Sequence, residues 1–284
     1  MNRSYALLGG KLGHTMSPPI HKALFDLKGR EFTYELIELS PGELEANTKR
    51  LRSLSGFNIT IPHKMGIIPL MDKLDETAVR YNSVNCADMK DGVLTGYNTD
   101  CVGFLEAIKA MGADLGGRVL LAGCGGVGRM MAVEAALAGA DLTIAVLESD
   151  MPLAEQAAAE IKAMRPDAKL TLSVINEVKA EGGFDLLMNA TPVGMYPNVG
   201  KCAVSDELIA ASSAVFDVIY NPGETELLKN ANALGKKTSG GMSMLVWQAV
   251  KAHEIWDGDI YTLEEVTAII DEMQSQVDEL FPLK

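Results

Sequence analysis

The sequence predicts an α/β fold with two domains, the second of them a Rossmann-type dinucleotide-binding domain. Strand-like and helix-like segments alternate over the first hundred residues, which is typical of largely parallel sheets. A glycine-rich turn between a strand and a helix follows in residues 118–128. The length of 284 residues suits two domains, and a hydrophobic content of 48% excludes disorder as the default.

The first part of the chain predicts strands and helices in turn. Apolar runs of strand type cover residues 5–8, 32–39 and 57–61. Helices are expected over residues 18–27, 41–54 and 101–111. In the first helix we expect Ser17 as N-cap and Pro18 at the first helical position. In the second we expect Ser40 as N-cap, with Glu43 at the third helical position.

The glycine-rich turn has the composition of a dinucleotide site. Gly123, Gly125 and Gly128 form G-x-G-x-x-G, and Glu148 follows twenty residues after the last glycine. The flanking segments are a strand at 119–122, an Ala-rich helix at 130–138 and a strand at 142–147. Glycines permit close approach to a pyrophosphate, the helix N-terminus favours its charge, and the acid binds ribose hydroxyls. Two alternatives to a dinucleotide remain for this turn: it binds a methyl-donor nucleotide, or it binds no ligand.

The remaining segments complete this second domain and end in helices. Further strands are expected at 170–175, 184–189 and 215–219, and helices at 153–164, 225–234, 242–256 and 263–280. The boundary is expected near Gly112, and the final helices are expected to pack back on the first domain. The predicted domains are therefore residues 1–111 completed by 238–284, and residues 112–237.

Charge and cysteine usage exclude several classes of function. The formal net charge of −13 makes nucleic acid and anionic membranes improbable partners. The cysteines are scattered without metal-ligand spacing, so we expect neither disulfides nor a Cys-based metal site, and a reducing cytoplasm fits. No segment reaches the ~20 apolar residues of a membrane span, and no signal peptide is expected.

Two hydroxyls precede the first predicted helix. Thr15 and Ser17 stand two residues apart, where free backbone N–H groups and the helix dipole favour an anion such as a carboxylate. The alternative is that Ser17 only caps the helix. His14 and His21 flank the same helix and have no matching acidic pattern, so both are interpreted as structural.

A second polar segment contains a candidate base. Asn58 and Thr60 share one face of a strand that Pro62 ends, which suggests a ligand-facing edge. Lys64 follows at the start of the next segment, where a helix N-terminus disfavours a cation and eases its deprotonation. Asp100, in the first turn of another helix, could pair with Lys64, although sequence spacing does not show that they meet. The alternative for Lys64 is a solvated surface residue.

Further polar positions follow strands of the second domain or lie in the late helices. Small polar loops at residues 189–195 and 217–222 follow two predicted strands. Gln248 lies inside an apolar helix, where a buried amide needs a partner or a ligand. Ordinary packing between domains is the alternative for Tyr220 and Gln248.

Taken together, these segments resemble the shikimate dehydrogenase family, which includes quinate/shikimate dehydrogenases. The resemblance covers residues 5 to about 256 and rests on His14-x-x-Ser17-Pro18, Asn58-x-Thr60-x-Pro62-x-Lys64, Asn98-Thr99-Asp100, Gly123-x-Gly125-Gly126, Asn189-Ala-Thr-Pro and Met244-Leu-x-x-Gln248. It implies an N-terminal substrate domain, a Rossmann domain and an active site in the cleft between them. It also implies reversible reduction of 3-dehydroshikimate to shikimate.

The resemblance also implies roles for individual residues. It implies that the enzyme uses no metal ion. Lys64 and Asp100 are implied as the catalytic pair, which would move the proton of the alcohol. Substrate contacts are implied for Thr15, Ser17, Thr60, Asn85, Tyr220 and Gln248. Cofactor contacts are implied for Gly123, Gly125, Gly126, Val127, Gly128, Glu148, Thr191, Pro192, Val218 and Gly241.

Three departures from the family pattern stand out. Thr15 replaces a serine, Lys11 replaces a proline, and Cys101 replaces a glycine. In addition, the Asn-Arg-Thr triplet that usually marks NADP use is absent after the second Rossmann strand. Glu148 stands there instead, where it would repel a 2′-phosphate, so the sequence predicts that NAD is favoured over NADP.

The sequence therefore predicts a cytoplasmic NAD(P)-dependent oxidoreductase that acts on a small cyclic hydroxy acid, shikimate, in aromatic amino acid biosynthesis. A quinate or dual quinate/shikimate dehydrogenase is the first alternative. A catalytically silent ligand sensor is the second, and the Lys64–Asp100 pair and the absence of a basic patch argue against it. The chain is expected to be a monomer or a homodimer.

Overall fold

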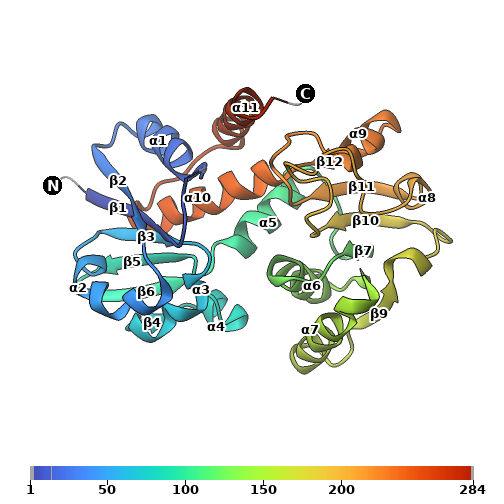
Figure 1. Ribbon diagram of the computed structural model, residues 1–284, viewed down its shortest axis with the longest axis horizontal. Coiled ribbons are helices and arrows are strands. Elements are labelled where there is room, and N and C mark those ends of the chain that lie inside the picture. The colour runs from blue at the N-terminus through green and yellow to red at the C-terminus, as the bar shows by residue number, and fades with distance from the viewer. Residues whose placement is uncertain (1–2, 14, 283–284) are drawn as a thin grey trace. The chain divides into compact units, whose positions relative to one another are not determined.

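The computed structural model describes residues 3–13 and 15–282, so the interpretation of His14 as structural lies outside the described residues. The chain forms two compact units (Figure 1). One comprises Met1–Gly103 and Leu245–Met273, and the other Phe104–Met244 and Gln274–Lys284. The predicted α/β class is confirmed. The domain bounds inferred from the sequence stay a prediction.

The first unit contains a mixed six-stranded sheet with the order β2-β1-β3-β5-β6-β4. Its strands are β1 (Arg3–Gly9), β2 (Phe32–Glu38), β3 (Gly56–Ile59), β4 (Lys73–Leu74), β5 (Cys86–Lys90) and β6 (Val93–Tyr97). β1 pairs in parallel with β2 and β3, whereas β5 pairs antiparallel with β3 and β6. The β5–β6 hairpin was not predicted, although Asp91-Gly92, both at positive φ, is a typical hairpin turn.

The helices of this unit are α1 (Ser17–Leu27), α2 (Thr48–Leu51), α3 (His63–Gly66), α4 (Glu76–Tyr81) and the main part of α10 (Gly241–Asp257). The division between the units falls inside α5 (Asp100–Ala110), α10 and α11 (Leu263–Leu280). Within the described parts of the chain, no helix is long and apolar enough to cross a membrane.

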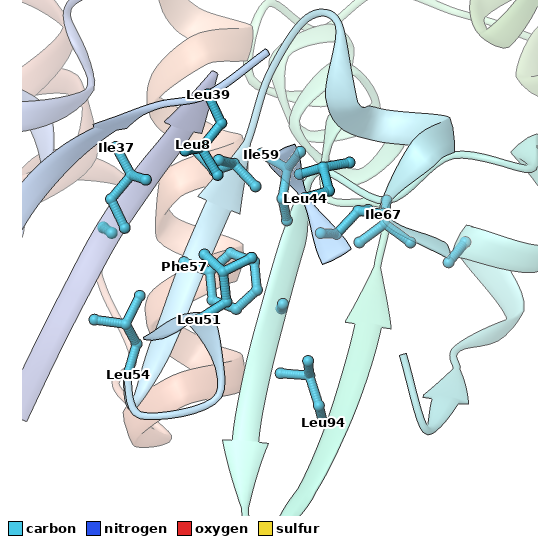
Figure 2. Close-up of a cluster of buried hydrophobic side chains, with 14 residues drawn as sticks. Leu8, Ile37, Leu39, Leu44, Leu51, Leu54, Phe57, Ile59, Ile67 and Leu94 are labelled. Atoms are coloured by element: carbon cyan, nitrogen blue, oxygen red, sulfur yellow. The ribbon is translucent and has the colours of Figure 1, made fainter. Parts of the chain in front are cut away.

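Two apolar clusters cover the two faces of the first sheet. Leu8, Phe57 and Ile59 belong to one, which also takes in Ile37, Leu39, Leu44, Leu51, Leu54, Ile67 and Leu94 (Figure 2). The other contains Tyr5, Phe25, Cys86 and Trp256, with Tyr34 packed against it. Because side chains alternate along a strand, Asn58 lies between Phe57 and Ile59 but faces the second, aromatic cluster.

The prediction of a single helix over residues 41–54 is wrong. The segment forms two 3₁₀ turns, η1 (Pro41–Glu43) and η2 (Glu45–Asn47), and one α-helical turn, α2. Polar side chains occupy carbonyls that a continuous helix would use: Asn47 Nδ2 donates to the Glu43 carbonyl at 2.9 Å, and Thr48 Oγ1 to the Glu45 carbonyl at 2.8 Å. Such local bonds compete with the helical ladder.

The second unit contains a six-stranded parallel sheet with the order β12-β11-β10-β7-β8-β9. Its strands are β7 (Arg118–Ala122), β8 (Asp141–Val146), β9 (Lys169–Val174), β10 (Phe184–Asn189), β11 (Ser212–Asp217) and β12 (Lys237–Ser239). Its helices are α6 (Gly126–Ala138), α7 (Met151–Met164), α8 (Asp206–Ala210) and α9 (Glu226–Ala233). The strand order reverses between β7 and β10, and ligands bind beyond the carboxyl ends of the strands at such a point.

Candidate active site

The topology of the first sheet explains why three distant polar residues meet. β3 and β6 run in the same direction, so their carboxyl ends lie at one edge of the sheet. β5 runs in the opposite direction, so it begins at that edge. Lys64 therefore follows β3, Asp100 follows β6 and Asn85 precedes β5, all at the same edge.

Lys64 and Asp100 form an ion pair at this edge. Lys64 Nζ lies 2.6 Å from Asp100 Oδ2, and Asn85 Nδ2 donates to Asp100 Oδ1 at 2.8 Å. Both carboxylate oxygens thus have a partner, and Asp100 is the first residue of α5, where the helix dipole stabilises a negative charge. The side chains of Lys64 and Asp100 are 27% and 21% exposed, so both remain accessible to a bound molecule.

Two residues that the sequence interpretation did not assign to the site hold this pair in place. Asn98 Oδ1 accepts from the Asp100 backbone N–H at 3.1 Å, and the buried Thr99 N–H donates to Asn85 Oδ1 at 2.6 Å. Gln248 Oε1 lies 3.3 Å from Thr99 Oγ1, which joins α10 to the cluster. The signal was present in the sequence, since Asn98 and Thr99 stand in a polar run directly after a strand.

Thr15 and Ser17 form a second polar pair, at the start of α1. The N-cap of this helix is Met16 rather than Ser17, so the predicted capping role of Ser17 is wrong. Thr15 Oγ1 instead accepts from the Ser17 backbone N–H at 3.2 Å, and it donates to Ser17 Oγ at 3.3 Å. The Ser17 hydroxyl is thereby available to a ligand. Both residues are half-buried.

Thr60 lies at the carboxyl end of β3, between the sheet and the α3 turn that carries Lys64. Its backbone N–H donates to the Leu8 carbonyl at 2.8 Å, and its side chain is half-buried. The peptide bond Ile61-Pro62, which follows one residue later, is cis. In this unit the structure thus brings Lys64, Asn85, Asp100 and Gln248 together in one bonded cluster, with Thr60 on the same chain segment as Lys64.

The glycine-rich turn of the second unit leaves open space where a dinucleotide would bind. Gly123 adopts a φ of +91°, and a Cβ at Gly128 would lie 2.5 Å from the Gly123 carbonyl oxygen, so the chain itself requires both glycines. In contrast, a Cβ at Gly125 or Gly126 would meet nothing within 4 Å. These two positions therefore form a cradle that side chains would fill, which fits a bound pyrophosphate.

Thr191 and Pro192 follow β10, Val218 follows β11, and Gly241 begins α10. A Cβ on Gly123 would lie 2.7 Å from Thr191 Cγ2, so the loop after β10 packs on the glycine turn. Gly241, at the start of α10, approaches Val218 so closely that a Cβ would lie 1.9 Å from its carbonyl oxygen. Tyr220 is half-buried further along the loop after β11.

A buried carboxylate organises both loops. Asp217, at the end of β11, is fully buried and accepts from Asn189 Nδ2 at 2.9 Å, Thr225 Oγ1 at 2.7 Å and the Ile219 N–H at 3.1 Å. Asn189 Oδ1 in turn accepts from Thr191 Oγ1 at 2.7 Å. Burial raises the pKa of Asp217, while the hydrogen bonds from Thr225, Ile219 and Asn189 oppose that rise.

We expect Asp217→Leu to lower the free energy of unfolding by about 3 kcal/mol or more, because it leaves three buried donors without an acceptor. Asp217→Asn keeps the shape and an acceptor oxygen, so its change should stay within about 1 kcal/mol. Because burial raises the folded-state pKa, the stability that Asp217 contributes is present at low pH and decreases as the pH rises through that pKa. Urea unfolding at several pH values checks both points; equal losses in the two variants would contradict this account.

Comparisons with known proteins show which family this chain is similar to. The family described as "Shikimate dehydrogenase substrate binding domain" matches residues 7–87. A shikimate dehydrogenase (NADP(+)) from Caldanaerobacter subterraneus subsp. tengcongensis is 35% identical over 263 residues, covering 90% of this chain and 92% of its own length.

Two solved structures are similar over nearly the whole chain. Shikimate 5-dehydrogenase from Listeria monocytogenes, in complex with shikimate and NAD, is 30% identical with a TM-score of 0.85 and covers 95% of this chain and 96% of its own. The enzyme from Thermus thermophilus, in complex with NADP(H) and shikimate, is 30% identical with a TM-score of 0.79 and covers 95% and 99%.

The predicted preference for NAD over NADP is wrong, because the curated relatives are named as NADP(+) enzymes. The prediction depended on charge repulsion from Glu148. In the structure Glu148 is exposed and begins a short 3₁₀ turn, η4 (Glu148–Asp150). The charge of an exposed carboxylate is screened by water and salt, and its side chain is free to turn away, so it is a weak barrier to a phosphate.

Proposed function

The chain belongs to the shikimate dehydrogenase family, and we propose that it interconverts shikimate and 3-dehydroshikimate with NADP as the cofactor. The observation that carries this proposal is the Lys64–Asp100 pair, held by Asn85 at the carboxyl edge of the first sheet. A partly exposed amine beside a fixed carboxylate is suited to moving the proton of an alcohol. The family relationship indicates that this alcohol is shikimate.

Lys64 and Asp100 would act as one proton-transfer unit. In alcohol oxidation Lys64 Nζ takes the hydroxyl proton while the C–H bond gives up a hydride; in ketone reduction the ammonium returns the proton to the carbonyl oxygen. Asp100 stabilises the ammonium and is itself kept in one orientation by Asn85 and by the Asn98 contact to its backbone. A fixed donor in the correct orientation lowers the entropic cost of the reaction.

The second unit would hold the cofactor, and NADP when bound supplies the hydride acceptor. The open positions at Gly125 and Gly126 suit its pyrophosphate, next to the N-terminus of α6. The residues proposed to contact it are Gly123, Gly125, Gly126, Val127, Gly128, Glu148, Thr191, Pro192, Val218 and Gly241.

We propose that Thr15 and Ser17 bind the substrate carboxylate. Their hydroxyls lie side by side next to the N-terminus of α1, which favours an anion. Thr60, Asn85, Tyr220 and Gln248 are proposed to contact the substrate as well. Asn85 is the best supported of these four, because it already bonds the catalytic carboxylate.

Steady-state kinetics test the proposed function. Shikimate oxidation with NADP should show saturable turnover, and NADPH should be oxidised in the presence of 3-dehydroshikimate. Quinate serves as the comparison substrate in the same assay. Tight binding of shikimate without turnover would favour a sensor instead, and a higher kcat/KM for quinate would overturn the choice of substrate.

Ser17→Ala should raise KM for shikimate about tenfold to a hundredfold with a smaller effect on kcat, because a hydrogen bond to a charged group contributes about 1.5–3 kcal/mol. Since Ser17 does not cap α1, the melting temperature should change little. Ser53→Ala, at an exposed serine that precedes the amino end of β3 and so lies at the opposite edge of the sheet, is the matched control. An unchanged KM would remove Ser17 from the carboxylate site.

A further inference from the structure

The carboxyl end of α11 places three side chains on one face of the helix. Gln274, Asp278 and Phe281 stand at positions i, i+4 and i+7, which is the spacing of one helix face. The backbone N–H of Phe281 donates to the Val277 carbonyl at 2.9 Å, so the helical hydrogen bonding extends to Phe281. These residues belong to the second unit, as do the loops that follow β10 and β11.

Gln274 and Asp278 hold the backbone of the loop after β11 at two points. Gln274 Nε2 carries two hydrogens, and it donates to the Tyr220 carbonyl at 3.2 Å and to Asp278 Oδ1 at 3.2 Å. Asp278 Oδ1 also accepts from the Gly223 backbone N–H at 3.3 Å. One pair of side chains on the helix therefore bonds the loop at two residues that are three positions apart.

Gly223 lies very close to this pair. A Cβ at Gly223 would lie 2.3 Å from Gln274 Nε2 and 2.8 Å from Asp278 Oδ1, so a side chain there would displace the two groups that bond the loop. The φ of Gly223 lies outside the left-handed range that favours glycine, so the backbone conformation itself does not require one. The close approach of Gln274 and Asp278 thus explains why glycine occupies this position.

The same helix face reaches the loop after β10. The ring centroids of Phe281 and Tyr196 lie 5.3 Å apart, a distance at which aromatic side chains attract each other. The Tyr196 backbone N–H donates to the Asn221 carbonyl at 2.9 Å, which joins the two loops. The helix face therefore contacts both the loop that carries Thr191 and the loop that carries Tyr220.

We propose that Gln274 and Asp278 are positioning residues for the substrate: they fix the backbone of the loop after β11, so that the Tyr220 side chain is in place before shikimate binds. The proposal rests on the proposed function, in which Tyr220 contacts the substrate, whereas the bonds that hold the loop do not depend on it. A loop that is ordered before binding loses little backbone entropy when the ligand arrives. Releasing the loop should therefore weaken substrate binding and leave proton transfer at Lys64 unchanged.

Hydrogen exchange tests the loop contacts without any substrate. In the free protein, peptides that contain residues 219–224 should exchange their backbone hydrogens faster in Gln274→Glu than in wild type, as measured by mass spectrometry. The reason is that a glutamate cannot donate to the Tyr220 carbonyl and repels Asp278. Gln274→Lys restores a donor for both groups and should return the exchange to near the wild-type rate. An unchanged rate in Gln274→Glu would overturn the proposal.

Gln156→Glu is the matched control. Gln156 is exposed and donates to Glu160 at 3.1 Å, which is the same i,i+4 contact between an amide and a carboxylate, on α7 of the same unit. This variant should leave both the exchange of residues 219–224 and the KM for shikimate at their wild-type values. The effect of Gln274→Glu is then separated from the general effect of losing one such contact on a helix.

Steady-state kinetics with shikimate and NADP test the link to the substrate. Gln274→Glu should raise KM for shikimate about fivefold to twentyfold with kcat within about twofold of wild type, because the substrate must then order the loop. Gln274→Lys should restore KM to within about twofold. Equal rises of KM in the two variants would show that the helix only packs on the loop, and would overturn the positioning role.

Asp278 gives a second pair of variants at an exposed position, where substitution does not endanger folding. Asp278→Ala removes the acceptor for the Gly223 N–H and should raise KM for shikimate about threefold to tenfold. Asp278→Asn keeps an acceptor oxygen and should leave KM within about twofold of wild type. A wild-type KM in Asp278→Ala would remove Asp278 from the positioning role.

The two possible failures are distinguishable. If the wild-type protein does not oxidise shikimate, the proposed function fails together with the substrate contact of Tyr220, and hydrogen exchange still decides whether α11 holds the loop. If the exchange of the loop rises as expected in Gln274→Glu but KM is unchanged, the positioning role is overturned while the proposed function stands.

Discussion

Lys64→Ala should lower kcat for shikimate oxidation by about 10²- to 10⁴-fold, the usual contribution of a positioned acid or base, with a much smaller change in KM. The reason is that Lys64 Nζ, 2.6 Å from Asp100, is the amine that would take the alcohol proton. Steady-state kinetics with shikimate and NADP measure the effect. Lys49→Ala, at an exposed lysine outside the site, should leave kcat unchanged.

Asp100→Asn should also reduce kcat strongly, because Asn85 and Lys64 would both lose their charged partner. If the two residues act as a unit, the Lys64→Ala/Asp100→Asn double variant should be little worse than the worse single variant. Multiplicative losses would show that the two act independently. A Lys64→Ala enzyme with near wild-type kcat would refute the assignment of Lys64.

The sequence predicted the members of this pair but not their meeting. Lys64 and Asp100 are 36 residues apart, and their contact depends on the direction of β5 and β6. The alternation of apolar runs indicated parallel strands and helices, so it did not reveal this hairpin, although Asp91-Gly92 is a recognisable turn. The residues that support the pair, Asn98 and Thr99, directly follow the same hairpin.

Local polar chemistry explains two other wrong expectations. Ser17 was predicted to cap α1, but Thr15 takes the backbone N–H of Ser17 and the N-cap lies one residue earlier. The 41–54 segment has helical periodicity, yet Asn47 and Thr48 bond local carbonyls and divide it. Hydrophobic patterning does not show which carbonyl a nearby side chain will take.

The interpretation of His21 shows the limit of reading residues one at a time. From the sequence it was structural, since no acid accompanies it nearby. Its ring nitrogen Nδ1 lies 3.0 Å from Nε2 of His253, which is 232 residues away in the chain, so only the fold could reveal this buried contact. The strands β7 to β10, by contrast, were predicted to within one residue at each end, because continuous apolar runs are a local signal, whereas the short polar strand β12 was missed.

The glycine turn carries the second large expected effect. Gly125→Ala should weaken NADPH binding about tenfold to a hundredfold, because the new methyl group would enter the space proposed for the pyrophosphate, and overpacking of this kind costs about 1–3 kcal/mol. The protein itself should tolerate the change. Gly125 has a φ of −70°, and its Cβ would meet nothing within 4 Å, so the loss of a glycine N-cap should cost no more than about 1 kcal/mol.

Gly128→Ala is the matched comparison. Its Cβ would lie 2.5 Å from the backbone oxygen of Gly123, so this variant should lose stability as well as cofactor binding. Titration of NADPH fluorescence measures binding without shikimate, and thermal unfolding measures stability. The fold itself does not require a glycine at position 125. If Gly125→Ala loses NADPH binding while its melting temperature is unchanged, a bound ligand therefore occupies that space. Wild-type affinity in Gly125→Ala would instead place the pyrophosphate elsewhere.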